Sequence, residues 1–244
     1  MRVLILSDIH ANIDALQAVE AEALQGQDPF DQIWVLGDLV DYGAAPAEVI
    51  AWVRAHATQV VRGNHDHAVG TGEDCRSAPL YHDLAVATRE YFRARLSLND
   101  LSYLAGLPLQ STVTLPSEVR AVLVHASPQD QLFGYVPTDA PDATWRAALD
   151  PAPFASFVFV GHTHDQFTRT IDLTTLVNPG SVGMPKDGDP RAEYAIFDDG
   201  RIDLCRVAYD TERAAARIAA LPLTPDQRHR LTGVIRHARL PDRT

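Results

Sequence analysis

Short apolar segments alternate with amphipathic helical patterns over the first 63 residues of the chain. The segments RVLIL, QIWVLG and TQVVRG, at 2–6, 32–37 and 58–63, have the length and content of strands buried in a sheet. After the first, apolar residues recur at helical spacing from Ile13 to Ala23, behind Asn12 as an N-cap. After the second, PAEVIAWVRAH begins with a proline suited to the first position of a helix. This alternation predicts parallel strands joined by helical crossovers.

Beyond residue 63 the patterns are mixed. Apolar runs predict two further buried strands, at 120–126 and 156–162. One or two helices are expected at 82–107, the second behind Asn99 as its cap, and the segment 127–151 is expected to be a loop with one short helix.

Two hairpins and two helices are expected in the last part of the chain. Alternating segments predict hairpins at 167–180 and 192–207, the second turning at Asp199-Gly200, and helical patterns follow at 210–220 and 224–237. No repeat or low-complexity linker divides the sequence. We therefore expect residues 1–244 to form one domain, with the segments at about 79–107 and 127–151 as possible cap-forming insertions.

The composition of the chain limits which binding partners and which cellular compartment are expected. A net charge of −11 at pH 7 argues against wrapping of nucleic acid, but allows a small phosphorylated substrate whose charge is met by bound metal. Two cysteines do not make a disulfide framework, and the apolar start is too short for a signal peptide. No run approaches the roughly 20 apolar residues of a membrane span. We expect a cytoplasmic protein with no membrane partner; the oligomeric state stays open.

Polar side chains follow five of the expected strands, at the point where each strand ends. They are Asp8 and His10, then Asp38 and Asp41, then Asn64, His65 and Asp66, then His125, and finally His162 and His164. Ligand sites in open α/β sheets lie beyond the carboxyl ends of strands, so we expect these side chains to meet. Imidazole nitrogens and carboxylate oxygens without a thiolate suit Mn, Fe, Zn, Co or Ni, and they exceed the needs of one tetrahedral ion. The sequence therefore indicates two metal ions.

These residues stand in motifs that resemble a known family. D-x-H, GD-x-x-D, GNHD, a lone histidine after a strand and GH-x-H follow one another in the order of the calcineurin-like metallophosphoesterases, over roughly residues 1–200. The segment NPGSVGMP at 178–185 and the hairpin after it look closest to the small bacterial phosphodiesterase branch. The resemblance implies an α/β fold, a four-layer αββα sandwich of two mixed β-sheets flanked by helices.

The resemblance also implies which residues hold two divalent metal ions, with manganese as the ion for assays. One ion would be held by Asp8, His10 and His164, and the other by Asn64, His125 and His162, with Asp38 bridging both. Two such ions about 3.5–4 Å apart can lower the pKa of a bridging water and bind both the attacking and the departing oxygen of a phosphoryl group.

A catalytic pair is implied next to these ligands. His65 would be the general acid that protonates the leaving group, oriented by Asp66, while His67 is expected to be a loop residue. Asp41 either orients a metal ligand or caps the turn that follows it. Ser181 is expected to form a turn, and Phe133 and Tyr135 are as consistent with packing as with substrate contact.

The reaction implied is hydrolysis of phosphodiesters. Protein phosphatases and dinucleoside tetraphosphatases of the superfamily typically carry Arg where this chain has Tyr42, and Glu where it has Asp66. Both differences favour phosphodiesters or small phosphomonoesters as substrates over phosphoproteins. The alternatives are a phosphomonoesterase or protein phosphatase and, from another class, a non-catalytic binding or scaffold subunit on the same fold. Nucleic acid is expected only as a short substrate.

Overall fold

Two five-stranded sheets form the centre of the molecule, and their strand ends carry the residues of interest. The structure is a computed structural model that describes residues 1–24, 29–152 and 154–241. The strands of the first sheet are β1 (Arg2–Leu6), β2 (Gln32–Val35), β3 (Gln59–Val60), β9 (Ala192–Asp198) and β10 (Arg201–Val207). Those of the second are β4 (Gln110–Leu115), β5 (Val119–Val124), β6 (Phe157–Phe159), β7 (Gln166–Ile171) and β8 (Thr174–Pro179). The helices of the described residues are α1 (Ile13–Leu24), α2 (Pro46–His56), α3 (Asn64–Thr71), α4 (Pro79–Arg93), α5 (Leu98–Gly106), α6 (Asp142–Leu149), α7 (Thr211–Ala219) and α8 (Pro225–His237), with a short 3₁₀ turn at Pro116–Glu118.

Both sheets are mixed. In the first, with strand order β10-β9-β1-β2-β3, the strands β1, β2 and β3 are parallel and β9 and β10 form an antiparallel hairpin at the edge. In the second, with order β4-β5-β6-β8-β7, the strands β5, β6 and β8 are parallel and the two edge strands are antiparallel. The predicted parallel strands with helical crossovers and both predicted hairpins are confirmed.

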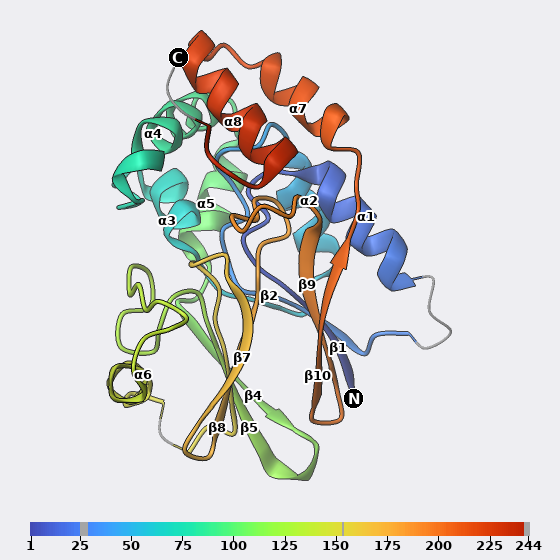
Figure 1. The fold of residues 1–244 in the computed structure, drawn as a ribbon, viewed down its shortest axis with the longest axis vertical. Coiled ribbons are helices and arrows are strands. Elements are labelled where there is room, and N and C mark those ends of the chain that lie inside the picture. The colour runs from blue at the N-terminus through green and yellow to red at the C-terminus, as the bar shows by residue number, and fades with distance from the viewer. Residues whose placement is uncertain (25–28, 153, 242–244) are drawn as a thin grey trace.

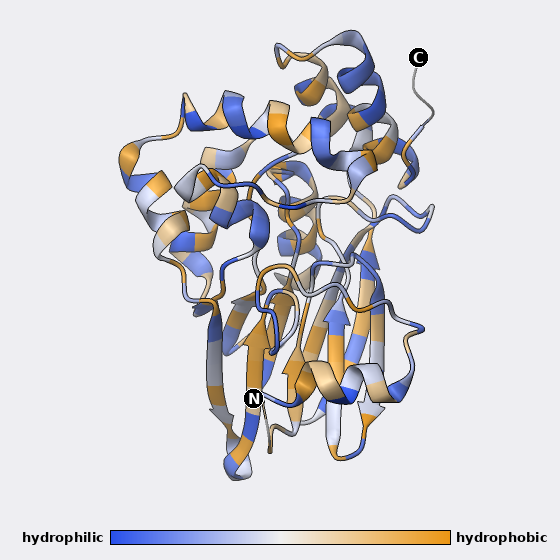
Figure 2. Ribbon diagram, turned by 90° about the vertical axis from the view of Figure 1, so that its left-hand side faces the viewer, coloured by the Kyte–Doolittle hydropathy of each residue, from blue (hydrophilic) through white to orange (hydrophobic). Residues whose placement is uncertain are grey.

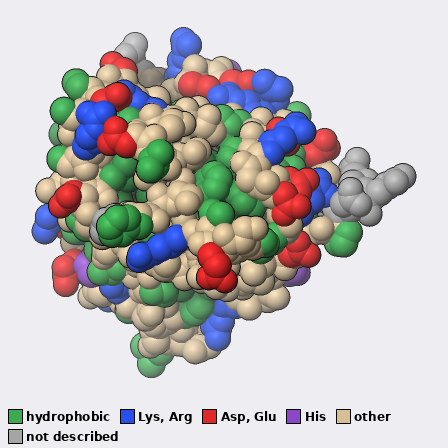
Figure 3. Space-filling view, turned by 90° about the horizontal axis from the view of Figure 1, so that it is seen from below, with side chains coloured by type: hydrophobic (Ala, Val, Ile, Leu, Met, Phe, Trp, Pro, Cys, Tyr) green, Lys and Arg blue, Asp and Glu red, His purple; other side chains and the backbone are tan. Residues whose placement is uncertain are grey.

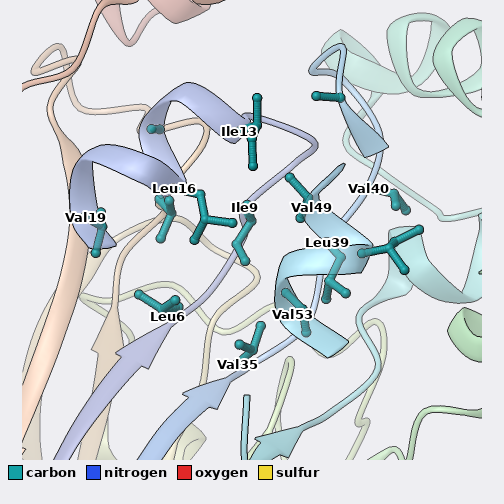
Figure 4. Close-up of a cluster of buried hydrophobic side chains, with 14 of the residues drawn as sticks. Leu6, Ile9, Ile13, Leu16, Val19, Val35, Leu39, Val40, Val49 and Val53 are labelled. Carbon is teal, nitrogen blue, oxygen red and sulfur yellow. The ribbon is translucent and has the colours of Figure 1, made fainter. Parts of the chain in front are cut away.

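Alternate residues of β1 face two different cores. Leu4 and Leu6 lie in a cluster with apolar side chains of α1 and α2, several of which Figure 4 draws together. Val3 and Ile5 belong to a second cluster, which lies between the two sheets. Successive side chains of a strand point to opposite faces, so a strand that is apolar throughout must be covered on both sides. The continuous apolar run RVLIL is explained by this double burial.

Aromatic rings fill the space between the sheets. Trp34 of β2 meets Phe159 of β6 edge-on, with ring centroids 5.4 Å apart, and Phe197 of β9 lies 6.4 Å from Phe159. On the outer face of the second sheet, Trp145 of α6 packs in a cluster with Val122 and other β5, β6 and β7 side chains. The layers therefore run helix, sheet, sheet, helix (Figure 1), which confirms the four-layer sandwich.

A group of helices lies over the carboxyl ends of the strands (Figure 1). Buried side chains of α4, α7 and α8 form one apolar cluster there, and these helices present polar residues on their other faces (Figure 2). The longest described helix, α4, has 15 residues. None of the described helices combines the length and apolar character needed to cross a membrane.

The opposite end of the sandwich is hollowed between the sheets. A cavity of about 360 Å³ there is lined in part by Leu115, Val119, Phe157 and Phe197. Seen from below, this end shows apolar side chains near its centre with charged ones around them (Figure 3). No residue of the predicted site lies at this end, because all of them follow the carboxyl ends of strands.

Four local expectations differ from the structure. β4 was not expected from the sequence, because its QSTVTL segment is polar and partly exposed at the edge of the sheet. Ser97, rather than Asn99, caps α5 by accepting a hydrogen bond from the amide of Asp100 at 3.1 Å. The segment after Gly63, expected as a loop, is the helix α3, and β3 is shorter than the expected strand at 58–63.

Replacing Phe159 by alanine is expected to lower the free energy of unfolding by about 3–5 kcal/mol, because the ring is fully buried between the sheets. Chemical denaturation of the purified variant measures this. Phe154, which is 91% exposed, is the matched control, and Phe154→Ala should change the value by less than about 0.5 kcal/mol. Equal effects of the two substitutions would contradict the packing described here.

Candidate metal centre and active site

Five loops at the carboxyl ends of the strands bring the predicted site residues together. Asp8 and His10 follow β1, Asp38 and Asp41 follow β2, Asn64, His65 and Asp66 begin α3 after β3, His125 follows β5, and His162 and His164 follow β6. All of them except His162 are buried, and His162 is half-buried. Burial of charged and polar side chains is unfavourable unless each has a hydrogen-bond or ionic partner, so the contacts of these residues have to be accounted for.

The loops bend sharply where they carry these side chains. Asp8, His10 and Asp38 have φ values of 51°, 47° and 54°, and His162 and His164 have values of 67° and 62°. A left-handed backbone is costly for residues other than glycine, at about 1–3 kcal/mol each, and such residues cluster at functional sites. Here the left-handed backbone directs the side chains of these loop residues toward the centre of the site.

The first cluster consists of Asp8, His10 and His164. The Nε2 atoms of the two histidines are 3.2 Å apart, and the Nε2 atom of His164 is 3.3 Å from Oδ1 of Asp8. The distance from Nε2 of His10 to the same oxygen is 3.9 Å. The three side chains can each offer one ligand atom to a single ion.

The second cluster consists of Asp38, Asn64, His125 and His162. Nε2 of His125 lies 3.3 Å from Oδ2 of Asp38, 3.0 Å from Oδ1 of Asn64 and 3.2 Å from Nδ1 of His162. The same Asp38 oxygen is 3.8 Å from Nε2 of His10 in the first cluster. Asp38 therefore lies between the two clusters, where a bridging ligand would be needed.

Hydrogen bonds behind the clusters show that the facing atoms are acceptors. The Nδ1 atoms of His10, His125 and His164 lie 3.0, 2.7 and 2.6 Å from the carbonyls of Val40, Leu36 and Met184, so each ring donates there and keeps the lone pair of Nε2 for the cluster. Two lone pairs 3.2 Å apart, as on His10 and His164, cannot hydrogen-bond to each other.

The oxygen atoms of the clusters are acceptors as well. The amide nitrogen of Asn64 donates to the carbonyl of Cys75 at 2.7 Å, which leaves its oxygen facing His125. Oδ1 of Asp8 is buried without a hydrogen-bond partner among the described residues. A set of converging acceptors of this kind, with histidines fixed by backbone carbonyls, fits divalent cations.

The charges of the second cluster shift one another's pKa. Burial alone would lower the pKa of His125, but the carboxylate of Asp38 raises it to about 9. Without a metal ion, Nε2 of His125 therefore carries a proton at neutral pH, and a divalent ion has to displace that proton before this nitrogen can be a ligand. Burial, followed by the charge of His125, lowers the pKa of His162 to about 3. Burial raises the pKa of Asp38, yet His125 and His65 bring it well below its usual value. The Asp38 carboxylate is therefore ionised, as a metal ligand has to be.

His65 is paired with Asp41, and not with Asp66 as expected from the sequence. Nδ1 of His65 lies 2.8 Å from Oδ2 of Asp41, and its Nε2 lies 3.4 Å from the hydroxyl of Tyr42. The prediction that Asp66 orients His65 is wrong because both stand in the first turn of α3, where adjacent residues point in different directions.

Asp66 instead holds two backbone segments together. Its carboxylate accepts hydrogen bonds from the amides of Asp38 at 2.8 Å, Leu39 at 2.8 Å and Gly63 at 3.0 Å. It thereby joins the start of α3 to the loop that carries Asp38. A Cβ atom on Gly63 would lie 2.0 Å from the Asp38 carboxylate, so this close approach requires glycine.

A cleft of about 260 Å³ opens next to both clusters. Its walls are formed by parts of the loop after β2, of α4 and the loop before it, of the loop before α6 and of the segment after β8. They include Tyr42, Arg76, Tyr81, Phe133, Tyr135 and Lys186. Asp38, Asn64, His65, His162 and His164 lie at its base. The cleft is large enough for a phosphoryl group and a small organic substituent.

Other residues named from the sequence have structural contacts. The hydroxyl of Ser181 donates to the carbonyl of Asp8 and accepts from the amide of Met184, both at 2.8 Å, so it forms the expected turn. Arg62 donates to the carbonyl of Ala105 in α5. His67 lies within α3, with Nε2 3.2 Å from a carboxylate oxygen of Glu73, and not in a loop.

The family model described as "Calcineurin-like phosphoesterase superfamily domain" matches residues 1–200. The chain belongs to the calcineurin-like phosphoesterase superfamily. The resemblance predicted from the motifs is thereby confirmed. The five motifs lie within the matched range, and the two clusters of acceptors within it are candidate sites for the divalent ions that such phosphoesterases use.

Individual relatives agree with this assignment. The chain is 30% identical over 234 residues to the uncharacterized protein MJ0912 of Methanocaldococcus jannaschii, covering 88% of this chain and 91% of that protein. It is 31% identical to a metallophosphoesterase from Sphaerobacter thermophilus, with a TM-score of 0.75 over 96% of this chain and 99% of that one. A shorter match, 37% identical over 68 residues, is to a symmetrical bis(5'-nucleosyl)-tetraphosphatase of Psychromonas ingrahamii and covers 27% of this chain and 24% of that protein.

Several cleft residues were not singled out from the sequence of this calcineurin-like phosphoesterase. Arg76, Tyr81 and Lys186 reach the cleft from segments outside the five motifs. Tyr81 and Arg76 carry no pattern that marks them. Lys186 does carry a signal, because it is the only lysine among 21 basic residues.

Divalent metal is expected to bind and to stabilise the protein. With manganese at about 100 times its dissociation constant, we expect a gain of about 2.7 kcal/mol, seen as a rise in melting temperature of about 5–10 °C over the chelated protein. His125→Ala should reduce the bound manganese by about one ion per chain, measured by elemental analysis. His229→Ala, which removes an exposed histidine of α8, is the matched control and should leave the metal content unchanged.

Proposed function

We propose that this protein is a dinuclear-metal phosphodiesterase. The observation that carries the proposal is the position of Asp38, whose Oδ2 atom lies 3.8 Å from the first cluster at His10 and 3.3 Å from the second at His125. One carboxylate in reach of two sets of acceptors suits two adjacent ions. Such ions supply Lewis acidity toward a phosphoryl group and lower the pKa of water.

The residues around the clusters have distinct parts in this proposal. Asp8, His10 and His164 would hold one ion, Asn64, His125 and His162 would hold the other, and Asp38 would be shared by both. Asp41 fixes the ring of His65 through Nδ1, so Nε2 faces the cleft next to the Tyr42 hydroxyl. His65 there donates a proton to the departing oxygen, since a neutral alcohol leaves more readily than an alkoxide.

The charge and shape of the cleft support a small substrate. A cleft of about 260 Å³ in a chain of net charge −11 suits a compact phosphodiester better than a nucleic acid duplex. We propose a cytoplasmic protein, since Cys75 and Cys205 are both free thiols. A non-catalytic scaffold is disfavoured because every acceptor of both clusters and His65 are present.

A second candidate reaction is hydrolysis of a dinucleoside polyphosphate. The 68-residue similarity to a bis(5'-nucleosyl)-tetraphosphatase favours it, and the aromatic side chains Phe133 and Tyr135 on the cleft wall could stack on a base. Such enzymes typically carry arginine where this chain has the uncharged Tyr42. This difference favours a phosphodiester substrate over a dinucleoside polyphosphate.

The first test compares bis-p-nitrophenyl phosphate, p-nitrophenyl phosphate and diadenosine tetraphosphate with chelated protein reloaded with manganese. Diester turnover that stops on chelation is the expected result. Turnover of the monoester alone would replace the proposal by a phosphomonoesterase, and turnover of the tetraphosphate alone by the second candidate. Lack of turnover of all three with metal bound would contradict an enzymatic role toward these classes.

The second test separates Asp41 from Asp66. We expect Asp41→Asn and His65→Ala each to lower kcat on the diester by about 10²–10⁴-fold while the bound metal stays at the wild-type level, because they remove proton transfer and not ligands. Asp66→Asn should instead lower the melting temperature, because its carboxylate joins the loop after β2 to the start of α3. A wild-type kcat in Asp41→Asn would contradict the pairing with His65.

A further inference from the structure

Among the described residues, Lys186 is one of two basic side chains that line the cleft, the other being Arg76, and it differs from the paired arginines nearby. Lys186 is the only lysine of the chain, beside 20 arginines. It forms no hydrogen bond or ion pair with any residue that the structure describes, and its ammonium group lies over the ring of Tyr81, 5.0 Å from the centroid. By contrast, Arg206 at the adjacent surface binds Asp187 and Glu193, and Arg230 beneath α4 binds Asp83.

The position of Lys186 is set by the same loops that carry the metal-ligand clusters. The segment that leads to it is bound to the loop after β1, since Val182 and Gly183 donate their amides to the carbonyls of Ser7 and Asp8, each at 3.0 Å. The carbonyl of Met184, two residues before Lys186, is the acceptor 2.6 Å from Nδ1 of His164. The backbone at the base of this side chain is therefore held against the first cluster.

Once divalent ions neutralise the carboxylates of the clusters, an ammonium group in this place is unfavourable without a further anion. Lys186 lines the same cleft as Asp38, His162 and His164, and it is half-buried. Two divalent cations in the clusters would repel it, because unit charges at short range interact by kilocalories per mole where water is partly excluded. A substrate phosphate between the metals and the ammonium group removes this repulsion and gives the cation its partner.

We propose that Lys186 is a specificity-determining residue that binds a non-bridging oxygen of the substrate phosphate from the cleft wall beside the first metal-ligand cluster. The inference rests on the proposed phosphoesterase function and adds to it a ligand contact from outside the five motifs. It also explains why lysine stands here in a chain that otherwise uses arginine. A compact ammonium group donates to one phosphate oxygen, whereas a guanidinium is broader and binds two.

The first experiment measures how accessible the Lys186 amine is to a chemical reagent, and it does not depend on enzymatic turnover. Reductive methylation of the manganese-loaded protein, followed by mass spectrometry, reports on a single ε-amine because the chain has one lysine. Inorganic phosphate is expected to slow modification of Lys186 several-fold, while chloride at the same ionic strength does not. Equal rates with phosphate and chloride would overturn the proposal.

The second experiment uses charge-matched variants. Lys186→Met is expected to raise KM for bis-p-nitrophenyl phosphate by about 10- to 100-fold with a smaller change in kcat, as for the loss of one charge-assisted hydrogen bond. Lys186→Arg should recover part of the affinity because it keeps the charge. Arg146→Met removes an equal charge from the exposed face of α6, where Arg146 pairs with Asp172, and should leave KM unchanged.

The two experiments separate failure of this inference from failure of the proposed function. If the protein is inactive but phosphate protects Lys186 from methylation, the proposed phosphodiesterase function is contradicted and the proposed phosphate contact of Lys186 is supported. An active protein with unprotected Lys186, or with a KM in Lys186→Met within about twofold of wild type, would contradict the anion site alone. An equal rise in KM in Arg146→Met would also overturn the proposal, since it would show a general effect of charge.

Discussion

Hydrogen bonds between neighbouring loops hold the candidate metal centre in place. The amides of Asp8 and His10 donate to the carbonyls of Gly37 and Asp38 at 3.0 and 2.9 Å, so the parallel pairing of β1 and β2 continues into the loops that follow them. The Asp66 carboxylate adds the start of α3 to the same network. Because these bonds fix the backbone, the side chains of the two clusters already point toward one another before a metal ion binds.

The network has to offset a backbone that is unfavourable in several places. Asp8, His10, Asp38, His162 and His164 are all left-handed, and Gly37 has a φ of 93° that its lack of a side chain allows. The two sheets beneath the site provide the compensating stability. Their shared core of aliphatic and aromatic side chains, with Trp34 and Phe159 fully buried, ends directly below the loops.

Charge is distributed so that cations are needed at the site. The chain is acidic, with 32 carboxylate residues against 21 basic ones, and carboxylate, carboxamide and imidazole ligand atoms converge in both candidate clusters. The basic side chains of the cleft wall lie over aromatic rings, with Arg76 over the ring of Phe133 and Lys186 over the ring of Tyr81. Divalent metal at the base would, together with these basic side chains on the wall, make the cleft suited to a phosphate.

The sequence by itself determined the strand and helix order of the first sheet, both hairpins and the residues of the two clusters, because local periodicity and motifs at strand ends carry that information. It did not reveal β4, whose polar edge-strand pattern has no strong period. Only the tertiary structure decided that Asp41, and not the adjacent Asp66, meets His65, and that Lys186 enters the cleft. Those contacts join segments far apart in the chain, and their side-chain directions depend on how the loops pack across the sheets.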